Sequence, residues 1–445
     1  MICIIIILTL LRQYRIDPMS ELKKVLIVTY YWPPAGGPAI QRTLKFVKYM
    51  RFFGWEPVIL TVENGEYPAI DPSLIQEIPD NIQVYKTKAF QPFQLYRMLT
   101  GKKGNTHNNA NVFGQKDKTF VERLAKWIRL NLFIPDARIG WYAYAVKAAK
   151  KIIEQEHIDL IYSSSPPHSL QLIAQKIAKQ NKIKWVADFR DPWSELVHYQ
   201  SYKRTWLTRK IDSHFEKSVF RSADRLVAAA NDYATCIKTH VDRKIEVIYN
   251  GYDPSDFPKP KSKNTEDFLI TYTGELSEDR IPHALLRALS RLEDSNIKLQ
   301  FIGNTCPELK QEIQQLNLGN KVILKPYMPH IASIAELQQS DLLLLVINQV
   351  ANGKGIVPGK IFEYLGTRKP ILCLGDPTGE AGEIIKTTNS GFCIAHHNEE
   401  EIFILLSRLS SGVLPGLSFQ TEQFERKNET GQLCDIFNTL VNKPS

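Results

Sequence analysis

The residues best suited to chemistry lie in the stretch Lys354–Asp376, where a Gly- and Pro-bearing loop leads into a short helix. Lys360 and Glu363 are three residues apart and therefore share one face of that helix. The helix N-terminus, at Gly359, offers free backbone N–H groups and the positive end of the helix dipole, which suit a phosphate. One turn further, the Glu363 carboxylate can accept two ribose hydroxyls. Loop, cation and carboxylate in this order predict a site for a nucleoside diphosphate.

A second group of suitable residues follows the predicted strand Phe268–Tyr272. Gly274 would let a phosphate approach the backbone, because glycine has no side chain. Arg280 could make a forked contact with the diphosphate. Together with Lys360 it would stabilise the negative charge that grows on a diphosphate leaving group as a glycosidic bond breaks.

The N-terminal half places two further motifs at the ends of predicted strands. Gly36 and Gly37 follow the strand Lys24–Tyr30, and we expect them to face a ligand, with an ordinary turn as the alternative. The glycines do not form a Gly-x-Gly-x-x-Gly dinucleotide motif. His168 lies in the turn Ser163–Ser169, at the entry to a helix, and we expect it to contact a ligand.

Alternating charges follow the predicted strand Lys184–Asp188. Asp188, Arg190 and Asp191 could bind substrate hydroxyls or phosphate, or they could form ion pairs that close their own loop, and the pattern favours neither. Arg42, in the helix after the glycine loop, joins them as a candidate contact for an acceptor or a sugar.

Two successive sets of alternating strands and helices position these residues. They predict an α/β fold with two doubly wound, Rossmann-like domains that face each other across a cleft. A chain of 445 residues is also too long for one hydrophobic core. The predicted divisions are an N-terminal extension at 1–18, a first Rossmann-like domain at 19–250, a linker at 251–264, a second Rossmann-like domain at 265–420 and a terminal helix at 421–445.

Charge is distributed unevenly along the chain. Residues 1–250 contain 37 Lys and Arg against 23 Asp and Glu, a net charge of +14, whereas residues 251–445 contain 19 against 24, a net charge of −5. The asymmetry indicates an anionic partner for the first half. No nucleic-acid-binding signature is present, so an anionic membrane surface or a phosphate-bearing lipid is favoured. Six scattered cysteines without a Cys-x-x-Cys motif argue against disulfides or a zinc site and fit a reducing cytoplasm.

Two apolar segments bear on membrane contact. Ile2–Leu11 is too short to span a bilayer and lacks the flanks of a signal peptide, so we expect an extension outside the fold, with a membrane-touching tip as the alternative. Lys118–Phe133 predicts an amphipathic helix with Leu124 and Trp127 on its apolar side. We expect this helix to pack on its own domain, and a basic, aromatic helix resting on lipid headgroups is the alternative.

Several motifs, taken in order, resemble a known family. VIYNGYD, TGELSEDR and PGKIFEYLGTRKPIL resemble the family 4 retaining glycosyltransferases of GT-B architecture. TYYWPPAGGPAIQR, SSPPHS and ADFRDPW resemble a bacterial surface-polysaccharide branch of that family. The resemblance covers about residues 22–440, and it is the order and spacing of the motifs that make it specific.

The resemblance implies an enzyme that moves a sugar from a nucleotide-diphosphate sugar to a glycan, with retention of configuration. It implies a lipid-linked acceptor bound by residues 19–250, a donor bound by residues 265–420, and a role in surface-polysaccharide or lipopolysaccharide synthesis. The cysteine and charge patterns favour a cytoplasmic location, with peripheral contact at the inner face of the plasma membrane as the expectation for the basic first half. It implies no cofactor and no obligatory metal. The implied roles are ribose binding by Glu363, diphosphate neutralisation by Arg280 and Lys360, contact with the transferring sugar by His168, and shaping of the donor–acceptor loop by Gly36 and Gly37.

Two positions depart from the family pattern. Gly355 stands where the family often has a second glutamate, eight residues before Glu363, and Glu275 stands where a basic residue is common. We therefore expect sugar recognition to involve His168 and the glycine loop, with domain closure as part of the mechanism. The alternatives are a GT-B nucleotide-sugar epimerase or hydrolase, and a non-catalytic nucleotide-sugar-binding protein.

Overall fold

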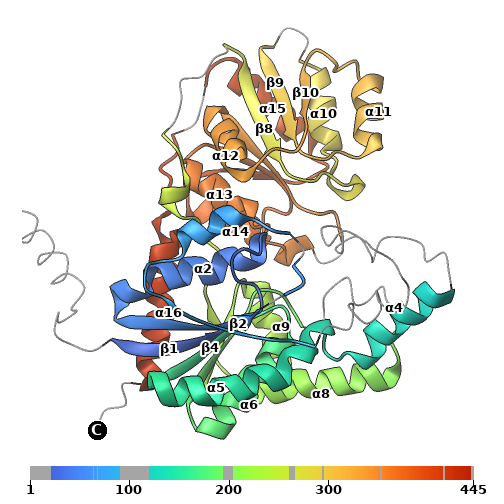
Figure 1. Cartoon of the computed structure of the whole chain (residues 1–445). Coiled ribbons are helices and arrows are strands. Elements are labelled where there is room, and N and C mark those ends of the chain that lie inside the picture. The colour runs from blue at the N-terminus through green and yellow to red at the C-terminus, as the bar shows by residue number, and fades with distance from the viewer. Residues whose placement is uncertain are drawn as a thin grey trace, which may run out of the picture. The chain divides into compact units, whose positions relative to one another are not determined.

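The computed structural model describes residues 22–90, 120–193, 204–259, 266–413 and 416–441, except 64, 68, 293, 294, 351 and 352. The chain forms two compact units, each described here by itself (Figure 1). The first unit consists of Met1–Tyr249 together with Glu429–Ser445, and the second consists of Asn250–Asn428. The predicted extension at 1–18 lies outside the described residues.

The first unit is built on a parallel sheet with the strand order β3-β2-β1-β4-β5-β6-β7. Branched apolar runs such as VLIV in β1 are buried on both faces, as is typical of parallel strands. Val25 of β1 lies between Pro57 and Leu160 of its neighbours. The strands are β1 (Lys23–Val28), β2 (Trp55–Val62), β3 (Gln83–Thr87), β4 (Leu160–Ser165), β5 (Lys184–Phe189), β6 (Arg225–Ala228) and β7 (Glu246–Val247).

Helices cover both faces of the first sheet. One face packs against α2 (Pro38–Met50) and α16 (Arg426–Val441), which contribute Leu44 and Phe437 to the same core. The helices of the other face are α5 (Tyr142–Glu156), α6 (Ser169–Asn181), α8 (Trp206–Ser222) and α9 (Asn231–Lys238). A further helix, α4 (Phe120–Leu132), meets the start of α8, where the Thr205 N–H donates to the Asn131 side chain at 2.8 Å.

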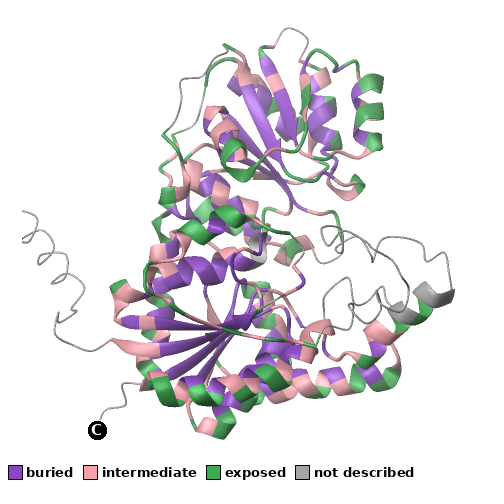
Figure 2. Cartoon of the chain, in the orientation of Figure 1, coloured by how far each residue is buried: buried purple, intermediate pink, exposed green. Residues whose placement is uncertain are grey.

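The second unit repeats this architecture on a parallel sheet of order β10-β9-β8-β11-β12-β13. Strand β11 reads LLLLV and is buried throughout. Figure 2 shows the central strands of both sheets as largely buried and the outer faces of the helices as mostly exposed. The strands are β8 (Phe268–Thr273), β9 (Ile297–Ile302), β10 (Val322–Lys325), β11 (Leu342–Val346), β12 (Ile371–Leu374) and β13 (Gly391–Ile394).

Helices also cover both faces of the second sheet. The core of one face is shared by α10 (His283–Ser290), α11 (Pro307–Gln315) and α15 (Glu399–Ser410). The remaining helices are α12 (His330–Gln339), α13 (Lys360–Thr367) and α14 (Glu380–Thr387). The prediction of two doubly wound, Rossmann-like domains is therefore confirmed. Among the described residues, no helix combines the length and the apolar character needed to cross a bilayer.

Strand order reverses once in each sheet, and these reversals decide where ligands can bind. From β1 the first sheet grows through β2 on one side and through β4 on the other, and from β8 the second sheet grows through β9 and β11. In open α/β sheets, ligands bind beyond the carboxyl ends of the strands at such switch points. The glycine loop follows β1 and His168 follows β4, whereas Gly274 follows β8 and the Lys360 helix follows β11. All the main candidate residues therefore lie at a switch point of their own sheet.

Candidate functional site

Two glycines shape the backbone at the carboxyl end of β8. Gly274 has a φ of 106°, which is strained for any residue with a side chain, and a Cβ there would lie 3.1 Å from Lys360 Nζ. Gly303, at the end of β9, packs so closely that its Cβ would lie 2.4 Å from the Gly274 carbonyl oxygen. Gly274 is exposed beside the Lys360 ammonium, and its N–H donates to the Ile302 carbonyl at 2.8 Å, so the missing side chain, rather than a free N–H, is what leaves room there for a ligand.

Lys360 is the central cation of the second unit. Its Nζ donates to the Thr273 carbonyl at 2.6 Å and lies 4.0 Å from the centre of the Tyr272 ring. Burial and the nearby Arg280 guanidinium lower the pKa of Lys360 to about 8. A lowered pKa means that the ammonium lacks sufficient counter-charge, which an anionic ligand would supply.

Arg280 is held beside Lys360 by two contacts. Its Nε donates to Asn348 Oδ1 at 3.1 Å, and its Nη1 donates to the Glu275 carbonyl at 3.2 Å. Asn348 is itself fixed, since its amide donates to Asp279 Oδ2 at 2.5 Å. The Asp279 carboxylate consequently has a lowered pKa, because hydrogen bonds and Arg280 outweigh the effect of its partial burial. Asn348 follows β11, so both strands of the switch point hold the guanidinium.

Helix α13 carries Lys360 and Glu363 on a firmly anchored backbone. The Tyr364 hydroxyl accepts from the Thr273 N–H at 3.2 Å and donates to the Leu344 carbonyl at 3.3 Å, which ties the helix to β8 and β11. Gly359 is the exposed residue that precedes the helix. The Glu363 carboxylate points out of the core and contacts His330 Nε2 at 3.0 Å.

In the first unit, His168 lies at the entry to α6 and is 1% exposed. Its ring stacks on Trp193, with centroids 4.7 Å apart and an angle of 17° between the planes. Burial and Arg190 lower the pKa of His168 to about 3, so the ring is neutral at physiological pH. Within the described residues neither ring nitrogen makes a hydrogen bond of ordinary geometry, although the Pro192 backbone lies near enough to affect the ring. The imidazole is therefore neutral and both of its nitrogens are buried, so it supplies no charge to a ligand.

The glycine loop after β1 is fastened to a second loop of the same unit. Gly36 N–H donates to the Ala69 carbonyl at 2.9 Å, and Asp71 N–H donates to the Pro34 carbonyl at 2.8 Å. A Cβ on Gly36 would lie 3.1 Å from the Asp71 Cβ, so the two loops pack closely. Gly37 is exposed, has a φ of 97° and precedes α2. Gly36 therefore serves loop packing, whereas Gly37 presents open backbone.

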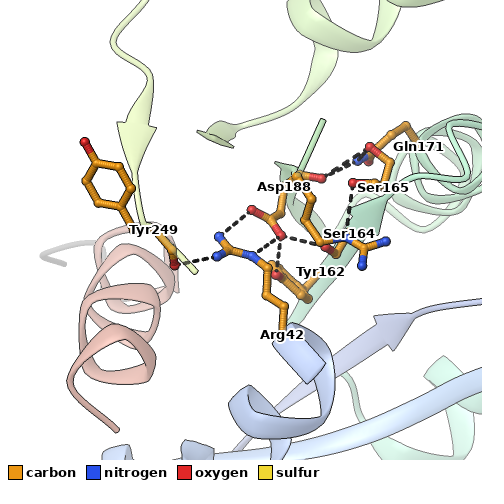
Figure 3. Close-up of polar contacts among 8 residues, drawn as sticks. Arg42, Tyr162, Ser164, Ser165, Gln171, Asp188 and Tyr249 are labelled. Carbon is orange, nitrogen blue, oxygen red and sulfur yellow. Dashed lines mark hydrogen bonds and ion pairs between the residues drawn. The ribbon is translucent and has the colours of Figure 1, made fainter. Parts of the chain in front are cut away.

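Arg42 and Asp188 bind each other inside the first unit (Figure 3). Two guanidinium nitrogens of Arg42 donate to the Asp188 carboxylate at 2.9 and 2.8 Å, and a third donates to the Tyr249 carbonyl at 2.7 Å. Tyr162 and Ser164 also donate to Asp188 Oδ2. Burial pushes the pKa of Asp188 upward, but the Arg42 guanidinium outweighs it, and the pKa is lowered. Both side chains are fully buried and occupied, so this geometry favours a structural role over contact with an acceptor.

The other two charges of this loop differ from each other. Arg190 donates to the carbonyls of Ser165 and Pro166, and it thereby holds the turn that carries His168. Asp191 is only partly buried, and burial raises the pKa of its carboxyl, with Arg190 acting in the opposite direction. Of the two, Asp191 is the one whose side chain keeps access to solvent.

The structure thus brings Gly274, Arg280 and Lys360 together, with Glu363 one helical turn beyond Lys360. The sequence interpretation did not include Asn348 or His330. Asn348 lies two residues after the buried strand β11, close to where Gly274 lies after β8, so its position was a usable signal. His330 follows a short, partly exposed strand and a Pro-containing turn, and nothing in the sequence near it indicates Glu363 as a partner.

Comparisons with known proteins agree with this geometry. Residues 110–256 match the family model described as glycosyltransferase family 4, and residues 254–411 match the model described as glycosyl transferases group 1. No match was found among curated proteins.

Several solved structures share the fold of this chain. A glycosyltransferase from Rickettsia africae is 14% identical, with a TM-score of 0.58 over 96% of this chain and 100% of that one. Anabaena HepE, solved with UDP, is 14% identical, with a TM-score of 0.58 over 94% and 100%. The lipopolysaccharide outer core galactosyltransferase WaaB is 13% identical, with a TM-score of 0.57 over 94% and 100%. The two adjoining family matches and the two-unit fold support a GT-B protein that is similar to the glycosyltransferase family 4 group.

Proposed function

We propose that the protein is a retaining glycosyltransferase that moves a sugar from a nucleotide-diphosphate sugar to a glycan acceptor. The observation that carries the proposal is the pair Arg280 and Lys360 beside Gly274, which is exposed and has no side chain to obstruct a ligand. Two cations at a positive-φ glycine form a site for a diphosphate. The lowered pKa of Lys360 supports this role, since a bound diphosphate would supply the missing counter-charge.

The two cations would act in catalysis as well as in binding. Negative charge accumulates on the diphosphate as the glycosidic bond breaks, and donors already aimed at that charge lower the barrier. Arg280 is held in place by Asn348, and Lys360 by the Thr273 carbonyl, so neither needs to reorganise during the reaction. Glu363 would hold the ribose. Retention of configuration, which the family resemblance implies, fits a step in which the leaving diphosphate assists attack from the same face.

Known proteins of the same fold support the choice of donor and pathway. HepE was solved with UDP and also with UDP-glucose, and WaaB is a galactosyltransferase of the lipopolysaccharide outer core. We accordingly propose a UDP-hexose as the first donor to test and a surface polysaccharide or lipopolysaccharide as the product. His168 and the Gly37 backbone would contact the sugar and the acceptor in the first unit.

The acceptor is proposed to be lipid-linked and presented at the inner face of the plasma membrane. The first 250 residues carry a net charge of +14, which suits anionic headgroups. On α4, Leu124 and Trp127 are each 46% exposed, and Arg123 beside them is also exposed. An apolar and basic helix face of this kind favours the lipid-surface alternative for α4. Sedimentation with anionic vesicles at low salt, and release at high salt, would support it.

Donor binding and transfer can be tested in sequence. A thermal-shift screen with UDP, ADP, GDP and their sugars should show a raised melting temperature for at least one nucleotide. Arg280→Ala and Lys360→Ala should weaken that binding. With the matching nucleotide sugar and a lipid-linked acceptor, the product should retain the anomeric configuration by NMR. No stabilisation by any nucleotide would refute the site, and an epimerised donor formed without acceptor would favour the epimerase alternative.

A further inference from the structure

His330 contacts Glu363, but neither His330 nor this contact has a role in the proposed function described above. His330 Nε2 lies 3.0 Å from Glu363 Oε1, and the two residues are 33 positions apart in the chain. We propose that His330 is a positioning residue that fixes the Glu363 carboxylate for recognition of the ribose diol. This inference rests on the proposed function, because it concerns the same donor site.

The direction of the hydrogen bond follows from the chemistry of the pair. An ionised carboxylate can only accept, so the imidazole donates through Nε2–H. The two carboxylate oxygens together offer about four lone-pair positions, of which His330 occupies one. The Glu363 carboxylate therefore retains enough acceptor capacity for two vicinal hydroxyls while the imidazole is bound. Because the bond constrains one oxygen, it limits the rotation of a side chain that would otherwise have to be ordered by the ligand.

Both residues project from rigid backbone. His330 is the first residue of α12, directly after Pro329, and this helix is anchored by Leu337, which is fully buried. Glu363 lies in the first turn of α13, between the buried side chains of Phe362 and Tyr364. The two helices also contact each other, so the imidazole and the carboxylate are held at neighbouring helix starts.

The exposure of the pair argues against a mainly structural role. The side chains of His330 and Glu363 are 53% and 39% exposed, and ion pairs this exposed contribute little to folding. The same unit contains a matched pair, in which His283 Nδ1 lies 2.7 Å from Glu312 Oε2. His283 also begins a helix directly after a proline, and no residue of the proposed donor site lies in that pair. Removal of His283 therefore provides a control of the same chemistry.

The experiment measures the preference for ribose over deoxyribose by isothermal titration calorimetry with UDP and 2′-deoxy-UDP. In the wild type, the lost contact with the charged Glu363 should make 2′-deoxy-UDP bind about tenfold more weakly. His330→Ala should reduce that preference about threefold or more, mainly through weaker UDP binding. His330→Gln retains an N–H donor and should restore most of the preference. His283→Ala should leave the preference unchanged.

Other results would contradict either the proposed donor site or the role of His330. If the wild-type protein binds none of UDP, ADP and GDP, the proposed donor site is wrong, and this inference fails with it. An unchanged preference in His330→Ala, or an equal loss of affinity for both nucleotides, overturns the inference alone. If His330→Ala has a lower melting temperature than His283→Ala, the same comparison of UDP and 2′-deoxy-UDP is made with His330→Leu instead. In a Glu363→Gln background, loss of His330 should have no further effect on the preference, and an additional effect would also contradict the proposal.

Discussion

The pH dependence of nucleotide binding offers the sharpest test of the role of Lys360. The pKa of Lys360 is lowered to about 8 in the free protein, and a bound diphosphate would keep the ammonium protonated. The protonated fraction of free Lys360 falls from about nine-tenths at pH 7 to about one-tenth at pH 9. The affinity for UDP should therefore fall about tenfold over this range. The terminal phosphate, with a second pKa of about 6, is ionised throughout.

Calorimetry at pH 7, 8 and 9 and constant ionic strength measures this change. At pH 8, binding should take up about half a proton per UDP, which appears as a dependence of the heat on the ionisation enthalpy of the buffer. Lys360→Arg is the matched control, because a guanidinium stays charged across the range and the affinity should be flat. A flat profile in the wild type, or an equal slope in Lys360→Arg, would refute the reasoning.

Stability should change with pH in the opposite direction. The folded pKa of about 8 lies below the usual 10.5, so the unfolded chain binds more protons between these values. The free energy of unfolding should therefore rise as pH increases through this window, by at most about 3 kcal/mol. Lys360→Met removes the buried, desolvated ammonium, so it should raise the urea midpoint at pH 7 while it weakens UDP binding. A lower midpoint would show that burial of the Lys360 ammonium does not destabilise the folded protein.

Three further predictions concern the backbone, the buried ion pair and metal dependence. Gly274→Ala should reduce UDP affinity tenfold or more and lower the free energy of unfolding by about 1–3 kcal/mol in urea, because Gly274 has a φ of 106° and lies against Lys360. Gly319→Ala is the control: Gly319 has open space around it, so neither the affinity nor the stability should change. Asp188→Ala removes the carboxylate that pairs with the buried Arg42 guanidinium and should cost about 3–5 kcal/mol by urea unfolding; a cost near zero would contradict the structural role. A chelator should leave UDP binding and transfer unchanged, and activity lost to the chelator but restored by Mg²⁺ or Mn²⁺ would contradict metal independence.

The local parts of the fold and site could be predicted from the sequence. The strand and helix alternation follows from hydrophobic period, and it led directly to two doubly wound sheets. The common face of Lys360 and Glu363 follows from helix geometry alone. In a parallel sheet, the loops after neighbouring strands lie at the same edge. This rule predicts that Gly274 lies at the ligand-binding edge of the second sheet and His168 at that of the first.

Pairings between distant segments could not be predicted in this way. Arg42 and Asp188 are 146 residues apart. The sequence left a ligand contact and an ion pair within its own loop equally open for Asp188, and it did not indicate Arg42 as the partner that the structure shows. Asn348 and Arg280 are 68 residues apart, and their contact depends on the adjacency of β8 and β11. Hydrophobic periodicity also predicted the apolar face of α4. It did not predict whether other residues pack against that face, and Trp127 is 46% exposed. Sequence spacing fixes which side a residue faces, whereas the partner on that side depends on the tertiary arrangement.

The return of the chain to its first unit has a consequence for synthesis and engineering. The core of that unit includes Leu433 and Phe437 of α16, and Phe437 packs against Trp55 with ring centroids 5.3 Å apart. The unit that is translated first therefore cannot complete its core until the end of the chain has emerged, whereas the second unit can close earlier as an insertion. A chimaera that exchanges donor specificity should for this reason replace residues 250–428 and keep both flanking segments from one parent.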